Sequence, residues 1–252
     1  MSRQARDWDA STYERVSDPQ AEWAVEVLDR LPLAGDETVL DAGCGSGRVT
    51  RMLVERLPRG HVVAVDAAAA MVEHARQALG DRATVIRSDL TDLVLDEPVD
   101  AAFSNAVFHW IPDHDRLFAS LYAALRPGAR LIAQCGGAGN VARFHSLVAE
   151  VAAEEPFAEH LGGWRGPWNF ATAEETAARL EAAGFQDVDT WLKPRPTAPP
   201  EPREYFRSVC LGHHVQLLPA ELRDRFVNEV AARAGERPTL DYVRLNIAAR
   251  RA

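Results

Sequence analysis

Short apolar runs alternate with helix-like segments through the first half of the chain. The apolar runs are interpreted as buried strands and lie at residues 39–41, 61–66, 84–87, 99–103 and 129–135. Between them, apolar side chains recur every three or four positions, which predicts amphipathic helices at 48–57, 68–79 and 115–125. Such alternation is typical of a parallel sheet covered by helices. We therefore expect a doubly wound α/β fold.

Beyond residue 135 the alternation is less regular. Residues 140–155 carry a helical apolar stripe, and residues 172–183 form a second expected helix. The latter opens with the capping box Thr172-Ala-Glu-Glu175. Further strands are expected at 185–192 and 240–248.

Residues 193–202 contain five prolines. We interpret them as a stiff connection into a small helical cap rather than a disordered linker, because the about 50 residues that follow are too few for an independent core. Helices of this cap are expected at 203–212 and 219–234. We predict one domain over residues 1–252, with a core of about 20–135, 172–192 and 238–252 and a cap of about 136–171 and 194–237.

Charge and composition narrow the function classes. Acids outnumber bases 37 to 28, a formal net charge of −9, and the basic tail near the C-terminus is short. Nucleic-acid binders need a basic stripe, so we expect a small-molecule substrate and no nucleic acid. The longest apolar run is interrupted by Asp66 and is too short to span a membrane. The first residues lack a secretory signal and the three cysteines form no CxxC pair, so we expect a cytoplasmic protein. No obligatory protein partner is evident from the sequence.

The most informative segment is the turn after the first strand, Asp41-Ala-Gly43-Cys-Gly45-Ser-Gly47. A strand, a glycine turn and a helix present backbone amides to a ligand at close range. A dinucleotide loop would need glycine where Arg48 stands, and no lysine follows to bind a nucleotide triphosphate. Asp41 would repel a pyrophosphate but attract an ammonium group. The loop therefore indicates a cofactor with an amino-acid tail.

Two further acids follow neighbouring strands. Asp66 ends the second strand, where a carboxylate can accept both hydroxyls of a ribose. Asp89 ends the third strand, where it could accept from an adenine amino group. Each acid alone could simply cap a helix or turn, but three in register behind a glycine loop indicate an adenosine with an amino-acid tail.

This arrangement resembles the class I S-adenosylmethionine-dependent methyltransferase family. The family's successive motifs match Asp41–Gly47, Asp66 and Ser88–Leu90, and the resemblance covers about residues 36–135. It implies a Rossmann-like sheet of seven strands, whose last strand is antiparallel, and S-adenosylmethionine as cofactor. The cofactor-binding residues it implies are Asp41, Gly43, Cys44, Gly45, Gly47, Asp66, Ala67, Met71, Ser88, Asp89, Leu90, Ser104 and Asn105.

Two positions in this set depart from the family's pattern or allow two roles. Family members often carry a polar residue just after the ribose acid, where this chain has a run of alanines beginning at Ala67. Met71 could pack on the adenine face or could belong to the core.

The fourth strand leads into Ser104-Asn-Ala-Val-Phe-His109-Trp110 at the mouth of the crevice. This pattern resembles the trans-aconitate methyltransferase group, as do Trp8, Tyr13 and the segment around Phe170. Those relatives methylate small carboxylic acids, which are ionised at neutral pH and need no general base. A phenol or amine acceptor would need one. His109 is the catalytic candidate, as a base or as a donor that orients a carboxylate, or it packs at the strand end.

The expected acceptor contacts lie largely in the cap. Trp164 and Trp168 could cover an apolar pocket or attach a loop to the core. A carboxylate needs a cation, and Arg143, Arg165 and Arg207 are candidates. By analogy, Trp8 and Tyr13 could form a lid over the cofactor. The substrate-binding set is thus Trp8, Tyr13, His109, Trp110, Arg143, Trp164 and Trp168. No metal site is expected, because His213 and His214 are adjacent and point apart on a helix.

The sequence thus favours methyl transfer from S-adenosylmethionine to a small molecule, with a carboxylate oxygen as the preferred acceptor. The alternatives are methylation of an amine or phenol in a secondary metabolite and a non-catalytic S-adenosylmethionine-binding regulatory module. A nicotinamide-dependent oxidoreductase is disfavoured by Arg48 and Asp41.

Overall fold

The computed structural model describes the backbone of residues 18–252 and the side chains from Trp23 onward. Within these residues, seven strands form one sheet in the order β3-β2-β1-β4-β5-β7-β6. The strands are β1 (Thr38–Ala42), β2 (His61–Asp66), β3 (Ala83–Arg87), β4 (Val99–Asn105), β5 (Leu125–Gly136), β6 (Phe185–Pro194) and β7 (Val243–Arg251). The first five run parallel, and β7 is antiparallel to both β5 and β6. The predicted seven-stranded α/β sheet with an antiparallel last strand is confirmed.

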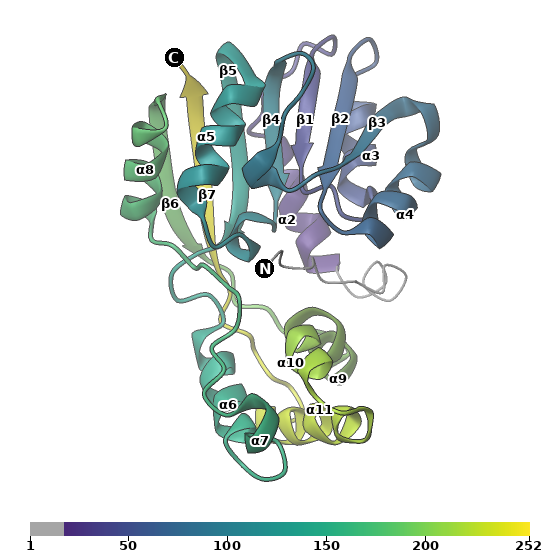
Figure 1. The fold of residues 1–252 in the computed structure, drawn as a ribbon, viewed down its shortest axis with the longest axis vertical. Helices are drawn as coiled ribbons and strands as arrows, with labels where there is room; N and C mark the ends of the chain where they lie inside the picture. Colours follow the sequence, from purple (N-terminus) through teal and green to yellow (C-terminus); the bar gives the residue numbers. More distant parts are fainter. Residues whose placement is uncertain (1–17) are drawn as a thin grey trace.

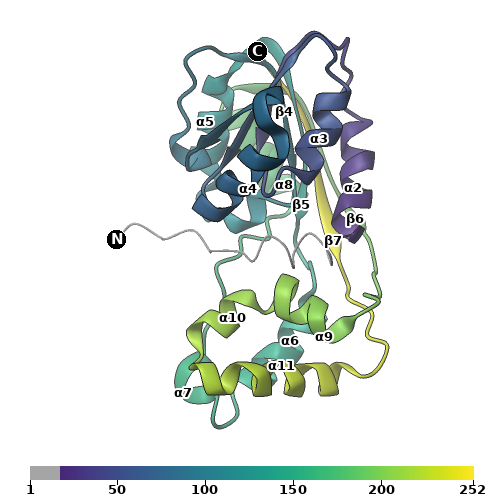
Figure 2. The same ribbon diagram turned by 90° about the vertical axis from the view of Figure 1, so that its right-hand side faces the viewer.

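Helices cover both faces of the sheet (Figures 1 and 2). One face carries α2 (Asp18–Leu28), α3 (Arg48–Glu55) and α4 (Ala69–Leu79), which share a buried core with β1 and β2. The other carries α5 (His114–Ala124) and α8 (Ala173–Ala182), packed around a second core. Each fully buried aliphatic or aromatic side chain in these cores contributes about 1.5–3 kcal/mol. The sheet is thereby held rigid from both sides.

The remaining helices form a cap beyond the carboxyl ends of the parallel strands (Figure 1). They are α6 (Ala142–Ala152), α7 (Ala158–Leu161), α9 (Pro202–Tyr205), α10 (Gly212–Leu217) and α11 (Ala220–Ala234). Their apolar sides meet in a third buried cluster that includes Phe144, Phe206 and Phe226. Trp23 of α2 and Tyr242, just before β7, join the same cluster. The cap is therefore packed internally and attached to the sheet through these two aromatic residues.

Short helical turns connect the larger elements. They are the 3-10 turns η1 (Gly80–Arg82), η2 (Leu90–Asp92) and η3 (Phe108–Trp110), and the π-helical turn η4 (Phe206–Cys210).

Several expected boundaries are wrong. The last strand begins at Val243 rather than residue 240, because Leu240 instead forms an isolated bridge with Thr197 of the proline-rich segment. The fifth strand begins at Leu125, which pairs with Val99. The helix expected at 203–212 is divided into α9, the π-turn η4 and the start of α10. The ends of these strands and helices depend on pairing with distant segments, which the pattern of apolar residues does not contain.

Candidate active site

The glycine loop joins β1 to α3 at the carboxyl edge of the sheet. The amides of Gly43 and Cys44 donate to the carbonyl of Val65 at 2.8 and 2.9 Å, which attaches the loop to β2. Gly43 has φ 91°, and a Cβ there would lie 2.2 Å from Cγ2 of Val107. Gly45 also has positive φ, but a Cβ there would meet nothing within 4 Å. The loop is thus packed tightly at Gly43 and open at Gly45, where a ligand can approach the backbone.

Asp41 lies beneath this loop. It is only 2% exposed and accepts a hydrogen bond from Oγ1 of Thr50 at 2.7 Å. Burial, opposed in part by that hydrogen bond, raises the pKa of Asp41 to about 7. The carboxyl therefore holds the start of α3 against β1, and its contact with a ligand ammonium stays a prediction.

Asp66 faces the loop from the end of β2. Its Oδ2 accepts from the amide of Gly45 at 3.0 Å, and its Oδ1 accepts from the amide of Ala68 at 2.8 Å. Burial raises the pKa of Asp66, while these amides lower it. Both oxygens retain capacity for a second donor. The carboxylate is therefore placed beside the open part of the loop, as a ribose-binding acid requires.

The adenine-side segment follows β3. Asp89 is exposed, and its Oδ1 accepts from both the amide and the hydroxyl of Thr91 at 2.9 Å, which caps η2. Ser88 donates to the carbonyl of Asp89, and Leu90 is buried. Oδ1 of Asp89 thus caps a turn, which is the alternative role expected for this acid. Binding of an adenine amino group by Oδ2 stays a prediction.

Three other members of the expected cofactor set are buried or half-buried. Met71 on α4 is 4% exposed, Cys44 is 7% exposed, and Ala67 is half-buried. Burial raises the pKa of the Cys44 thiol, so this residue is inert at neutral pH. Their contacts with a cofactor remain predictions.

β4 delivers the next polar residues to the crevice. Ser104 is buried and donates to the carbonyl of Ala42 at 2.6 Å, which joins β4 to β1; Asn105 is half-buried beside it. Ala106 then adopts φ 64°, a conformation that L side chains rarely adopt. This turn directs Val107 toward Gly43 and leads the chain into η3.

His109 occupies the centre of η3. It is 8% exposed, and its Nδ1 accepts a hydrogen bond from the amide of Gly136 at 3.2 Å. Its ring stacks on Phe170 with centroids 5.8 Å apart. Burial, then the positive charges of Arg244 and His114, hold the pKa of His109 well below its usual range. His109 is therefore a neutral imidazole at physiological pH.

An aromatic cluster continues from His109 into the cap. Phe170 contacts the rings of His109 and His145, each at 5.8 Å, and stacks on Trp168 at 6.2 Å. Trp110 lies 6.2 Å from Trp168. The cluster is completed by Trp164, His213 and His214. The fold thus brings Trp110, Trp164 and Trp168 into one cluster, and their contact with an acceptor stays a prediction.

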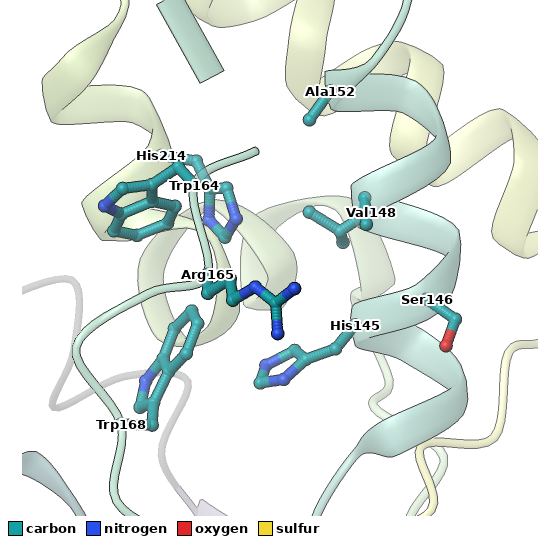
Figure 3. A pocket seen from close by; sticks show the side chains of 9 residues that line it. His145, Ser146, Val148, Ala152, Trp164, Arg165, Trp168 and His214 are labelled. Atoms are coloured by element: carbon teal, nitrogen blue, oxygen red, sulfur yellow. The ribbon is translucent and has the colours of Figure 1, made fainter. Parts of the chain in front are cut away.

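A cavity of about 290 Å³ opens within the cap at the far side of this cluster. Trp164, Trp168, His145 and His214 face it, and the guanidinium of Arg165 points into it (Figure 3). Arg143 does not line it: its side chain is 77% exposed and pairs with Asp241 at 3.6 Å. Arg207 is paired with Asp224.

Trp8 and Tyr13 lie outside the described residues. Among the residues that are described, no group of histidine, cysteine, aspartate and glutamate side chains could hold a metal ion. No helix in the described part of the chain is long and apolar enough to cross a membrane.

Sequence reasoning missed Arg244, His145 and Thr50. Arg244 is 2% exposed on β7, with its guanidinium 4.9 Å from the Trp23 ring centroid and its Nε donating to Gln134 at 3.3 Å. Arginine is mostly a surface residue, so its burial leaves no local signal. His145 follows Phe144 on an ordinary amphipathic helix, and only the fold brings it beside Phe170.

Comparison with known proteins agrees with this geometry. A family described as a methyltransferase domain matches residues 39–128. The chain is 35% identical over 187 residues to a trans-aconitate 2-methyltransferase of Methylobacterium nodulans, covering 74% of this chain and 67% of that protein. It is 32% identical over 237 residues to the protein of that name from Variovorax paradoxus, covering 91% and 90%.

Solved structures share the fold. A phosphoethanolamine N-methyltransferase of Haemonchus contortus, solved with S-adenosylhomocysteine, aligns with a TM-score of 0.64 at 19% identity, covering 96% of this chain and 56% of that one. A methyltransferase-like protein of Bacillus halodurans aligns with a TM-score of 0.59 at 19% identity, covering 90% and 97%. The open loop at Gly45 and the adjacent Asp66 carboxylate fit S-adenosylmethionine, the cofactor of this family. The chain belongs to the class I S-adenosylmethionine-dependent methyltransferases, in the group that includes the trans-aconitate methyltransferases, and it is an enzyme of that class.

Proposed function

We propose that this enzyme transfers a methyl group from S-adenosylmethionine to a carboxylate oxygen of a small molecule. The observation that carries the proposal is the hydrogen bond from the Gly136 amide to Nδ1 of His109. The relatives named trans-aconitate 2-methyltransferase support the same acceptor chemistry.

That hydrogen bond fixes the tautomer of His109. Because Nδ1 accepts, the proton of the neutral ring resides on Nε2. A general base would need Nε2 unprotonated, which would place a proton on Nδ1 against the Gly136 amide. Formation of the imidazolium is also opposed by burial and by the charge of Arg244. His109 therefore acts as a hydrogen-bond donor through Nε2, and a donor suits an acceptor that is already ionised.

The remaining residues have complementary roles. When bound, S-adenosylmethionine would supply an activated sulfonium methyl group. The residues that would hold this cofactor are the glycine loop, Asp41, Asp66 and the Ser88–Leu90 segment. The acceptor is oriented by His109 and covered by Trp110, Trp164 and Trp168. Alignment of the acceptor oxygen can lower the barrier by about 7–11 kcal/mol. Because a carboxylate is already ionised at neutral pH, the reaction needs no general base in addition.

The proposal extends to setting and organisation. The net charge of −9 supports a small-molecule acceptor rather than nucleic acid. All three cysteines are free, which supports a cytoplasmic location. We further propose that the enzyme acts without an obligatory protein partner. We also propose that the sheet core (about 20–135, 172–192 and 238–252) and the cap (about 136–171 and 194–237) act as one domain over residues 1–252.

The test is a transfer assay with labelled S-adenosylmethionine and a panel of small carboxylic acids. A methyl ester product releases labelled methanol in alkali, whereas a methylamine or an aryl methyl ether does not. We expect an alkali-labile product and a rate that is nearly flat between pH 6 and about 8. An alkali-stable product, with a rate that rises with pH, would show that the acceptor is an amine or phenol.

Two substitutions of His109 sharpen this test. Glutamine can place an N–H near the position of Nε2, and asparagine cannot reach it. We expect His109→Asn to lower kcat/KM about tenfold and His109→Gln about threefold, both without a change in the flat pH profile, since one hydrogen bond to a charged group is lost. A base role would give equal, larger losses and an altered pH profile.

A further inference from the structure

The loop of residues 162–168 returns to the sheet through a segment that contacts two strand ends. The amide of Asn169 donates to the carbonyl of His109 at 2.9 Å, in the turn that follows β4. The carbonyl of Ala171 accepts from the amide of Ala138 at 2.9 Å, in the segment that follows β5. The chain between the loop and α8 therefore bridges the ends of two neighbouring strands.

The side chain of Asn169 makes a second bond to the same turn. Its Nδ2 donates to the carbonyl of Pro112 at 2.9 Å. Because a carbonyl can only accept, the amide nitrogen must face it, which fixes the orientation of the side chain. A turn as short as η3 leaves its last carbonyls without partners inside the turn. Asn169 supplies two donors to these carbonyls, at His109 and at Pro112, and so holds the turn from outside.

The next residue, Phe170, packs on the ring of the same histidine. The planes of Phe170 and His109 differ by 19°, and those of Phe170 and Trp168 differ by 6°. A Cβ on Gly136 would lie 2.8 Å from Cε1 of Phe170, so the absence of a side chain there allows this close approach. The amide of Gly136 also donates to Nδ1 of His109 at 3.2 Å. His109 is thus held at its carbonyl, at Nδ1 and on one face of its ring.

None of these three contacts involves Nε2 of His109, the atom that would donate to the acceptor oxygen. Such a donor must be held to within about 0.5 Å of its productive position by the residues behind it. We propose that Asn169 is a positioning residue of the active site: its two hydrogen bonds hold η3, and with it the imidazole of His109. This role rests on the function proposed for His109. Because Asn169 directly follows Trp168, the same bonds hold the cover of the acceptor site and its donor as one unit.

The experiment uses a substitution that keeps the shape of the side chain and removes its donor. Asn169→Asp leaves the backbone bond to His109 in place but directs a carboxylate oxygen at the carbonyl of Pro112. Asn169 is half-buried, and the variant should fold. We expect kcat/KM in the labelled transfer assay to fall about tenfold, mainly through kcat. Asn169→Ala, which removes the same donor without adding a charge, should have an effect of the same size.

The matched control is Asn228→Asp on α11. It adds the same charge to the cap and keeps the oxygen that accepts from Nε of Arg203. We expect wild-type activity from this variant. A loss equal to that of Asn169→Asp would show that the added charge, and not the missing donor, is responsible, and would overturn the proposal.

A second readout needs no acceptor. Nitrogen-15 NMR of the histidine-labelled full chain with S-adenosylhomocysteine bound distinguishes the two neutral tautomers of an imidazole, and the His109 signals are those missing in His109→Asn. We expect only the Nε2–H tautomer in the wild type and in Asn228→Asp. We expect a mixture of tautomers in Asn169→Asp and Asn169→Ala, because the ring is no longer held against the Gly136 amide.

The two readouts separate the positioning role from the proposed reaction. Unchanged His109 signals in both Asn169 variants would overturn the positioning role, whatever their activity. Altered His109 signals, with no alkali-labile product formed by the wild type from any acid, would instead refute the proposed reaction and leave the role of Asn169 in place.

Discussion

The carboxyl edge of the sheet and the cap bury opposite kinds of titratable group. Beneath the glycine loop, Asp41 and Asp66 are carboxylates whose pKa values burial raises, that of Asp41 to about 7. Around the cap cavity, His145 and His214 are imidazoles whose pKa values burial lowers, to about 4 and about 3. The cause is the same on both sides, since burial disfavours the charged form of any group.

The sheet edge and the cap can therefore stabilise ligands of opposite charge. A hydrogen-bond donor or a cation at the loop would lower the pKa values of the two carboxyl groups and favour their ionised forms. An anion in the cap would raise the pKa values of the two imidazoles and favour their protonated forms. S-adenosylmethionine carries an ammonium and a sulfonium beside its one carboxylate, whereas the proposed acceptor offers a carboxylate. The same physical cause thus gives the two sides buried groups that ligands of opposite charge would stabilise.

The largest effect should come from closing the packed part of the loop. Gly43→Ala places a Cβ 2.2 Å from Val107 at φ 91°, so we expect a loss of about 3 kcal/mol from overpacking and strain together, with cofactor binding abolished. Gly45→Ala is the control, because its Cβ meets nothing within 4 Å, and it should cost about 1 kcal/mol of unfolding free energy. Denaturant unfolding and calorimetric binding measure both. Equal stability losses in the two variants would contradict the assigned packing.

The second effect tests the sheet side of the comparison directly. The unfolded Asp41 ionises near its ordinary pKa of 3.8, whereas the folded pKa is about 7, so the folded state binds the extra proton between these values. Stability from this group is therefore present at low pH and lost as the pH rises through 7. Asp41→Asn keeps an acceptor for Thr50 but cannot ionise. We expect the free energy of unfolding of the wild type, relative to this variant, to fall by about 2 kcal/mol between pH 5.5 and 8.

Thermal or denaturant unfolding of the two proteins in parallel at each pH provides the measurement. The difference between the proteins removes the contribution of every other titrating group. If the difference in the free energy of unfolding between the two proteins is constant with pH, Asp41 is ionised throughout. The raised pKa of a buried carboxyl group at the sheet edge would then rest on Asp66 alone.

The parts of the site that could be predicted are those fixed by neighbouring residues. The strand, the glycine turn and the helix after it are one continuous segment, so the spacing of Gly43, Gly45 and Gly47 determines their geometry. Asp66 could be placed because it ends the adjacent parallel strand. The amide partners of Asp66 and the burial of Asp41 depend on how the loop closes, which no local pattern describes.

The cap contains the placements that no local pattern could supply. Trp164 and Trp168 are conspicuous in the sequence, but of the three candidate arginines the predicted substrate-binding set contained Arg143 and not Arg165. Arg143 faces outward beside Asp241, Arg207 pairs with Asp224, and Arg165 enters the cavity. These outcomes depend on contacts between segments far apart in the chain. The tautomer of His109 likewise depends on Gly136, at the end of another strand.

The smallest of the three effects tests the ribose-binding role predicted for Asp66. Asp66→Ala removes the carboxylate that accepts from Gly45 and Ala68 and that is predicted to bind the ribose. We expect S-adenosylmethionine to bind at least about tenfold more weakly, equivalent to about 1.4 kcal/mol. Asp89→Ala is the matched control at the next strand and should have a smaller effect, since Asp89 is exposed and caps a turn. Calorimetry with S-adenosylmethionine decides the matter: an unchanged cofactor affinity of the Asp66→Ala variant removes Asp66 from the ribose site.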